Sequence, residues 1–391
     1  MAKTTKTKPK KFHKSKIFFN YATVGPVNAA SYRAASEFLK DYLQIGPPEV
    51  LDKYDVYADK LAQEAAKLLN CSPKEISYIK NTTEGIFIAS ETLPLKSGDE
   101  VLLMANEYPA NLLPWLKKRR DGIIVKLIDA KDNRHAFYKL LENITTKTRV
   151  VSISWGQYYD GFFADLELLS KVCKENNAFL VVDGVHGVGS RKIDLQKVNI
   201  DILSCGGQKE IGAVVGIGFI YVNKNTLGKL LDFKIGIRSV TNFDKSGYEL
   251  KKDATRFYDG TQNILGIVSL YAALKDINDT GIGVIEKKNI NLLNEYKTIL
   301  RDNNIVFIDY KNQADILSLK VPKPEALTAF LREKNIYVKT VKNALRISFS
   351  HHCNVEDFLV LVKHIRTWTN LLSEKQFNKN FDAEIKLKKE A

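Results

Sequence analysis

The sequence predicts an α/β fold with a large domain, in which helices cover a mixed, mostly parallel sheet, and a smaller α+β domain after it. Strand-like and helix-like segments alternate from residue 99 to residue 222. Segments 178–183 and 214–222 are almost continuously apolar, which is typical of strands buried on both faces. Beyond about residue 265, long helical patterns precede short strands, which indicates a second domain.

Each element of the large domain is predicted from its own pattern. The helix over 165–177 places Leu166, Leu169, Val172 and Cys173 on one face. Strands are predicted at 99–106, 122–129, 149–155, 178–183, 200–207 and 214–222. Ligands on such sheets bind beyond the carboxyl ends of the strands, so Asp183 and His186 stand where a ligand would bind.

The smaller domain is predicted from long helices followed by short strands. Helices are predicted at 263–277 and 286–303, strands at 314–321 and 344–350, and a last helix from Asn354. Asn354 is a suitable N-cap for that helix. The predicted organisation is a basic flexible tail at 1–16, a large domain at 17–265, a small domain at 266–375 and a charged tail at 376–391.

Composition excludes several classes of protein. The chain has 391 residues, of which 45% are hydrophobic and 27% charged, as in globular proteins. No apolar run is long enough to span a membrane, and the first residues lack the apolar segment of a secretory signal. The four cysteines have no C-x-x-C spacing, which argues against a disulfide framework and a zinc site. We therefore expect a cytoplasmic protein without a metal.

The net charge of +14 raises the hypothesis of nucleic-acid binding. Much of the excess lies in the two ends, where lysine-rich tails are usually solvated. No basic stripe interleaved with exposed aromatic residues is present in the sequence, so we expect no specific binding of nucleic acid.

Glycines 184, 187 and 189 raise a second hypothesis, a dinucleotide-binding fingerprint. That motif needs the order G-x-G-x-x-G and an acidic residue about 20 positions later. Here the order is G-x-x-G-x-G and the acidic residue precedes the glycines, so this interpretation is weak.

Lys209 and Asp183 favour a different chemistry. Lys209 follows a predicted strand that ends in small residues, whereas most lysines simply reach solvent. A pyridoxal 5'-phosphate (PLP) enzyme needs a lysine that forms a Schiff base with the cofactor, and a carboxylate that keeps the pyridine nitrogen protonated. Both groups must meet at strand ends in one pocket, and these two residues satisfy that requirement.

Six segments, in order, resemble the class V aminotransferase family of fold-type I PLP-dependent enzymes, which includes cysteine desulfurases and isopenicillin N epimerase-like proteins. The resemblance covers about residues 17–370. The segments are NTTEGI (81–86), NEYPANLLPW (106–115), VVDGVHGVG (181–189), GGQKE (206–210), RFYDGTQN (256–263) and ALRISFS (344–350).

The resemblance implies a role for each matching residue. Lys209 carries the cofactor and moves the Cα proton, and Asp183 pairs with the pyridinium nitrogen. His186 lies near the phenolic oxygen or over the ring, although it can also be a core histidine. Tyr108 stacks on the ring, and Tyr158 contacts the phenolic oxygen.

Further residues are implied at the phosphate and at the substrate. Thr82, Thr83 and Gln208 bind the phosphate, and Thr261 reaches it from a partner subunit, which implies a homodimer with its active site at the interface. Arg346 binds the substrate carboxylate, although a surface ion pair is the alternative for this arginine. Arg238 shapes the mouth of the substrate site.

Departures from the family pattern bear on the reaction. Desulfurases carry a cysteine shortly before the arginine that corresponds to Arg346, whereas this chain has none there, and Cys353 follows the arginine instead. A persulfide mechanism is therefore disfavoured. Gly206 replaces the phosphate-binding serine usual in desulfurases. His351, His352 and Cys353 are adjacent and diverge, so they do not predict a metal site.

The first expectation is transamination of a small α-amino acid. Cysteine or cystine C–S elimination and epimerisation remain open, because all three begin with loss of the Cα proton. A binding or regulatory protein that retains the PLP fold is the non-enzyme alternative, and the presence of Lys209, Asp183 and Arg346 together argues against it.

Overall fold

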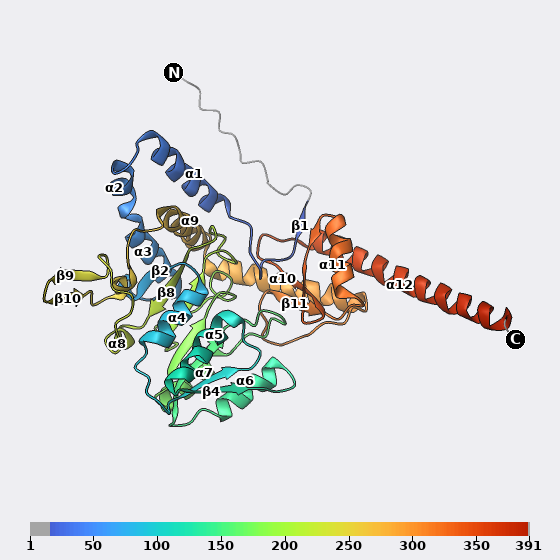
Figure 1. Cartoon of the computed structure of the whole chain (residues 1–391). Helices are drawn as coiled ribbons and strands as arrows, with labels where there is room; N and C mark the ends of the chain where they lie inside the picture. Colours follow the sequence, from blue (N-terminus) through green and yellow to red (C-terminus); the bar gives the residue numbers. More distant parts are fainter. Residues whose placement is uncertain (1–15, 390–391) are drawn as a thin grey trace, which may run out of the picture. The chain divides into compact units, whose positions relative to one another are not determined.

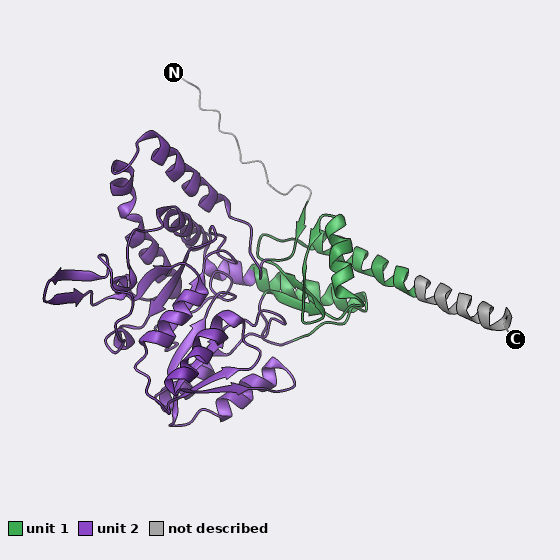
Figure 2. Cartoon of the chain, in the orientation of Figure 1, with its two compact units in different colours: residues 1–20, 288–309, 315–391 green, residues 21–287, 310–314 purple. Residues whose placement is uncertain are grey.

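The structure is a computed structural model that describes residues 16–389, with side chains described as far as residue 373. The predicted basic tail therefore lies, apart from residue 16, outside the described residues, as do the side chains of the predicted tail at 376–391. The chain divides into two compact units, shown in different colours in Figure 2. The larger unit is 21–287 with 310–314, and the smaller is 1–20, 288–309 and 315–391.

A seven-stranded sheet organises the larger unit (Figure 1), in the order β2-β8-β7-β6-β5-β3-β4. Its strands are β2 (Ile76–Ile79), β3 (Glu100–Met104), β4 (Ile124–Ile128), β5 (Thr148–Ser154), β6 (Phe179–Asp183), β7 (Ile202–Gly206) and β8 (Gly218–Val222). Strands β3 to β7 pair in parallel, and β8 runs antiparallel to both of its neighbours. This mixed, mostly parallel sheet confirms the predicted fold class.

Helices bury both faces of this sheet, as the continuous apolar strands predict. Every residue of β3, β6, β7 and β8 is buried. Helices α4 (Thr82–Thr92) and α5 (Pro109–Lys118) share one apolar core with β3 to β8, in which Trp115 is fully buried. Helix α6 (Asn133–Glu142) packs on β3 and β4, and α7 (Leu166–Glu175) packs on β6.

The remaining elements of the larger unit flank the sheet. They are α1 (Ala29–Gln44), α2 (Glu49–Asp55), α3 (Tyr57–Leu69), α8 (Lys224–Leu227), α9 (Ile264–Thr280) and the hairpin β9 (Val240–Asp244) and β10 (Gly247–Leu250). Short 3-10 helices are η1 (Pro73–Glu75), η2 (Arg119–Asp121) and η3 (Ala254–Phe257). Helix α9 packs against both α1 and α3, so it belongs with the larger unit, whereas the predicted domain boundary at residues 265–266 falls within its first turn.

The smaller unit is an α+β structure whose aliphatic core also holds a cluster of aromatic rings. Strand β1 (Ile17–Phe18) pairs in parallel with β12 (Ile336–Tyr337). Strands β11 (Ile316–Leu319), β14 (Ala344–Ser348) and β13 (Lys339–Val341) form an antiparallel sheet. Its helices are α10 (Ile282–Asp302), whose first residues belong to the larger unit, α11 (Pro324–Glu333) and α12 (Val355–Lys389). The ring of Tyr296 stacks on Phe358 and meets Phe19 edge-on.

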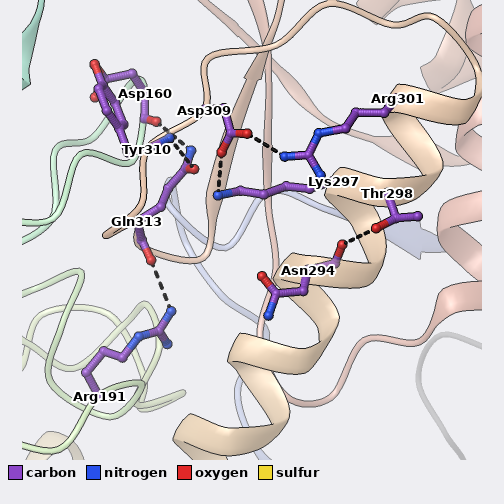
Figure 3. Close-up of polar contacts among 9 residues, drawn as sticks. All are labelled: Asp160, Arg191, Asn294, Lys297, Thr298, Arg301, Asp309, Tyr310 and Gln313. Atoms are coloured by element: carbon purple, nitrogen blue, oxygen red, sulfur yellow. Dashed lines mark hydrogen bonds and ion pairs between the residues drawn. The ribbon is translucent and has the colours of Figure 1, made fainter.

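The chain leaves the smaller unit at residue 309 and adds residues 310–314 to the larger one. The buried carboxylate of Asp160 accepts a hydrogen bond from the Tyr310 hydroxyl (2.8 Å), and both residues are drawn in Figure 3. The same carboxylate also accepts from Asn133 Nδ2 (3.1 Å). Gln313 Nε2 donates to the Asp160 backbone oxygen, and Arg191 donates to the Gln313 backbone oxygen. These bonds fix the segment on the larger unit.

Within the smaller unit, Figure 3 shows a second polar group just before this segment. Lys297 and Arg301 of α10 both pair with Asp309, at 2.8 and 2.6 Å.

Among the helices that the structure describes, none combines the length and the apolar character needed to cross a membrane.

Candidate active site

Three neighbouring strands of the larger unit end side by side. Ser154 at the end of β5 pairs with Asp183 at the end of β6, and Asp183 pairs with Ser204 of β7. The loops that follow carry His186 and Lys209. Parallel strand ends in an α/β sheet are the usual place for a ligand. The predicted site residues of these loops therefore gather at one edge of the sheet.

Lys209 and His186 are in contact at the centre of this edge. Lys209 Nζ lies 3.1 Å from His186 Nε2 and 5.7 Å from the centre of the Tyr108 ring. His186 is 4% exposed, whereas Lys209 is partly exposed and Tyr108 is 45% exposed. The amine is therefore reachable from outside, next to a buried imidazole and below an open aromatic ring.

Asp183 ends β6, near enough to Lys209 for the two charges to interact, and is 3% exposed. Burial raises the pKa of its carboxyl group to about 6, while the positive charge of Lys209 acts in the opposite direction. One carboxylate oxygen accepts a hydrogen bond from Val185 N (3.1 Å). A cation close to this carboxylate would favour its ionised form, as a pyridinium nitrogen would.

The start of α4 is joined to the end of β7. Thr82 Oγ1 accepts a hydrogen bond from Gly206 N (3.0 Å), and Ser204 Oγ donates to the Thr82 backbone oxygen (2.9 Å). Asn81 caps the helix by accepting from Glu84 N (3.0 Å). The helix N-terminus and its threonines therefore lie at the same sheet edge, an arrangement that suits a phosphate group.

The Gln208 side chain lies beside Gly206 at this sheet edge. Within the described part of the chain, its buried Oε1 atom has no hydrogen-bond partner. A Cβ atom at Gly206 would come within 2.6 Å of that Oε1 and 3.2 Å of Thr82 Oγ1. The glutamine side chain therefore takes the space that a serine at position 206 would need. The lysine, the buried carboxylate and the N-terminus of α4 with its threonine hydroxyl together fit PLP.

Tyr108 and Tyr158 form an aromatic pair over the site, with ring centres 5.1 Å apart and edge-to-face geometry. Sequence reasoning missed Glu107, the residue before Tyr108. The Glu107 side chain is 4% exposed, and its carboxylate accepts several hydrogen bonds. The signal available was an acidic residue inside a largely apolar segment that also holds an expected site residue. Burial raises the pKa of Glu107 to about 7.

Three predicted residues of the larger unit are not joined to this cluster by any described contact. Thr83 follows Thr82 in α4 and is exposed. Thr261 is exposed and lines a surface pocket with Tyr78, Lys234 and others. Arg238 pairs with Asp55 (3.2 Å), and both side chains are partly exposed.

Arg346 belongs to the smaller unit, where β14 lies between β11 and β13. Its side chain is 4% exposed, and its Nη2 donates to Asn20 Oδ1 (3.1 Å). It is therefore held inside the unit, unlike the arginine of a surface ion pair. This bond fixes the guanidinium group within the unit.

The four cysteines are free thiols. Cys173 and Cys205 are buried, and Cys71 and Cys353 are half-buried. Burial raises the pKa of the Cys71 thiol to about 12, which leaves it protonated near neutral pH. Cys353 packs against the core of the smaller unit. None of the four is a fully exposed thiol of the kind that a desulfurase uses to form a persulfide.

The family is decided by a comparison with known families, in which the model described as Aminotransferase class-V matches residues 52–361. The chain belongs to the class-V aminotransferase family. The resemblance stated from the six segments is thereby confirmed, together with its fold, its PLP cofactor and the expectation of an enzyme.

Relatives of this family member carry several names. The chain is 25% identical to a probable cysteine desulfurase of Methanothermobacter thermautotrophicus, over 89% of this chain and 87% of the relative. It is 28% identical to a probable cysteine desulfurase of Mycoplasma genitalium, over 92% and 94%. An uncharacterized aminotransferase of Schizosaccharomyces pombe is 24% identical, over 89% and 91%.

Solved structures show the same fold. A cysteine desulfurase of Thermococcus onnurineus matches with a TM-score of 0.82 at 21% identity, covering 91% of this chain and 95% of that one. The cystine C–S lyase C-DES, in complex with cysteine persulfide, matches with a TM-score of 0.83 at 22% identity, covering 90% and 97%.

Proposed function

We propose that this PLP-dependent enzyme removes the Cα proton of a small amino acid with Lys209, and that its reaction is transamination. The observation that carries the proposal is the contact of Lys209 Nζ with His186 Nε2 (3.1 Å) above the buried Asp183. PLP, when bound, withdraws electrons from Cα and so makes that proton removable. Lys209 would hold the cofactor, Asp183 would pair with its ring nitrogen, and Thr82, Thr83 and Gln208 would bind its phosphate.

The amine of Lys209 has the surroundings of a general base. It must be uncharged to accept a proton, and the neighbouring imidazole offers a lone pair to its N–H. Tyr108 and Tyr158 would cover the ring from the open side, where Tyr108 is exposed. His186 would hold the amine in place between proton transfers.

Arg346 is proposed as the group that binds the substrate carboxylate, because a guanidinium matches a carboxylate with two parallel hydrogen bonds. We expect Arg346→Lys to raise the KM for the amino acid about tenfold without removing the cofactor. Arg366→Lys is the matched control, since Arg366 also donates to an asparagine Oδ1 at 3.1 Å but lies on an exposed face. An unchanged KM in Arg346→Lys would exclude the carboxylate role.

A C–S lyase is the second candidate, favoured by the names of the relatives and of the C-DES structure. Elimination of sulfide or a persulfide product needs no cysteine of the enzyme, whereas a desulfurase needs an exposed thiolate. The state of the four cysteines supports elimination over desulfuration. Epimerisation would need a proton returned to the opposite face of Cα.

We also propose a cytoplasmic homodimer. Free thiols without disulfides suit a reducing compartment. Thr261 is exposed on its own chain, so it can reach the phosphate in a partner subunit, and Arg238 can shape the mouth of that site. Light scattering that finds only monomers at micromolar concentration would contradict the dimer.

The first experiment is the visible absorption spectrum of the purified protein with PLP. We expect an absorption band from the lysine-bound cofactor, and we expect borohydride to abolish it. The Lys209→Ala variant should lack this band. The control variant Lys275→Ala should keep it, because Lys275 pairs with Asp279 on the surface. Added amino acids would then distinguish the reactions. Transamination converts the band to that of the amine form and yields a keto acid, whereas cysteine elimination yields pyruvate and sulfide with the band restored. A protein without the band would contradict the proposal.

A further inference from the structure

A buried acidic group next to the site is not used by the proposed chemistry. The Glu107 carboxylate is 4% exposed and accepts hydrogen bonds from three residues. The donors are Asn111 Nδ2 (3.0 Å), Gln157 Nε2 (2.9 Å), and both the backbone N (3.1 Å) and the hydroxyl of Ser154. All four groups donate and none accepts, so the site is built for a carboxylate.

These donors come from two different segments. Asn111 lies in the first turn of α5, and Ser154 ends β5. Asn111 also accepts a hydrogen bond from the Ser152 hydroxyl, at its Oδ1 (2.5 Å). Glu107 therefore ties the start of α5 to the end of β5 through buried bonds.

The two tied segments carry the two aromatic rings of the site. Tyr108 directly follows Glu107 and is the N-cap of α5, yet its side chain makes no capping bond. Tyr158 directly follows Gln157, whose Oε1 is buried and, within the described residues, has no hydrogen-bond partner. The side chain of Gln157 is thus oriented by its bond to Glu107.

We propose that Glu107 is a positioning residue for the cofactor, because its carboxylate sets the backbone from which Tyr108 and Tyr158 cover Lys209. The inference rests on the proposed function in taking Tyr108 as the ring that stacks on PLP. A glutamine at position 107 has one acceptor oxygen, and its amide NH₂ would face donors, so part of the tie would break.

The test compares Glu107→Gln with Glu75→Gln. Glu75 is also buried, at 6% exposed, and accepts from two backbone N–H groups, those of Ser72 (2.9 Å) and Lys224 (2.8 Å). It precedes β2 at the end of the sheet opposite the site, since Ile76 pairs with Tyr221 whereas Gly218 faces Gly206. The dissociation constant for PLP, the circular dichroism of bound PLP and the melting temperature of the cofactor-free protein are measured for each.

At pH 8, where Glu107 is ionised, we expect Glu107→Gln to weaken PLP binding about tenfold, since hydrogen bonds to a charged group are lost, and to change the circular dichroism of the bound cofactor. Glu75→Gln should lower only the melting temperature. A Glu107→Gln protein with a lower melting temperature but unchanged PLP affinity and dichroism would overturn the inference. If that variant does not fold, Gln157→Ala, which removes one donor to Glu107, must change the dichroism of bound PLP relative to the wild type, and an unchanged spectrum overturns the inference equally. Absence of the lysine-bound band in the wild type would instead contradict the proposed function.

Discussion

Two buried carboxylates, Asp183 and Glu107, lie close enough at the edge of the sheet for the charge on one to raise the pKa of the other. Burial is the larger cause for both, and it raises the pKa to about 6 for Asp183 and about 7 for Glu107. Hydrogen bonds from Asn111 and Ser154 act against burial at Glu107, as does the positive charge of Lys209 at Asp183. Both carboxyl groups at this sheet edge therefore lose their protons between about pH 6 and pH 7.

Stability of the cofactor-free chain should show this titration. In the folded chain Glu107 keeps its proton up to about pH 7, against an ordinary value of 4.5. The stabilisation by that proton is fully present below pH 4.5 and is lost as the pH rises through 7, by at most about 3 kcal/mol. Between these values the free energy of unfolding should fall more steeply in the wild type than in Glu107→Gln, in which residue 107 does not titrate.

Urea unfolding of both proteins at intervals of pH measures this difference. Asp183 titrates in both proteins and so contributes to both curves. Parallel curves for the wild type and Glu107→Gln would contradict the raised pKa of Glu107.

At the scale of elements, the junction of α4 and β7 determines whether the helix N-terminus meets the strand ends. Gly85 permits this approach, because a Cβ atom there would overlap the Ser204 side chain. The Thr82 hydroxyl then supplies the acceptor for Gly206 N. The junction is a packing feature and also part of the site proposed for the phosphate.

Thr82→Val should weaken this junction, because it leaves the buried Gly206 N–H without its acceptor. We expect a loss of about 1–3 kcal/mol in the free energy of unfolding. Thr82→Ser, which keeps the hydroxyl, should lose less. Denaturant titration of the cofactor-free proteins measures the free energy of unfolding of both variants. Equal losses in Thr82→Val and Thr82→Ser would show that side-chain packing at this position, and not the hydrogen bond, determines the stability of the junction.

The sequence was sufficient for most elements near the site, because their patterns are local. The run 178–183 predicts β6, and the amphipathic period over 165–177 predicts α7, and both agree with the structure within a few residues. The pairing of Asp183 with Ser204 follows from parallel strand order, so the site edge was also predictable. The partners of Glu107 were not, since a carboxylate buried by donors from another segment leaves no local pattern.

At the scale of the whole molecule, residues 310–314 were also beyond sequence reasoning. Their place in the larger unit depends on Asp160, about 150 residues earlier, whose carboxylate the Tyr310 hydroxyl reaches. A contact at that separation has no periodic signature. The chain therefore passes between the two units more often than the linear domain prediction assumes.

Tyr310→Phe tests the strength of this attachment. Loss of a hydrogen bond to the buried Asp160 carboxylate should lower the free energy of unfolding by about 1.5–3 kcal/mol. Tyr54→Phe is the control, since its hydroxyl also donates over 2.8 Å, but to Asp41, whose carboxylate is only part-buried and also pairs with Lys53. Urea unfolding should show the larger loss for Tyr310→Phe, and equal losses would mean that burial of Asp160 adds nothing to the bond.

The pairing of β1 with β12 has a consequence for synthesis of the protein in the cell. Asn20, next to β1, reaches Arg346 across 326 residues of chain. At about 5–20 residues added per second, the ribosome needs roughly 15 to 65 s to make that interval. Until then the first strand of the smaller unit has emerged without its neighbours, and Phe19 has no core to enter. A chaperone that binds nascent apolar segments would find this one available for longer than almost any other in the chain.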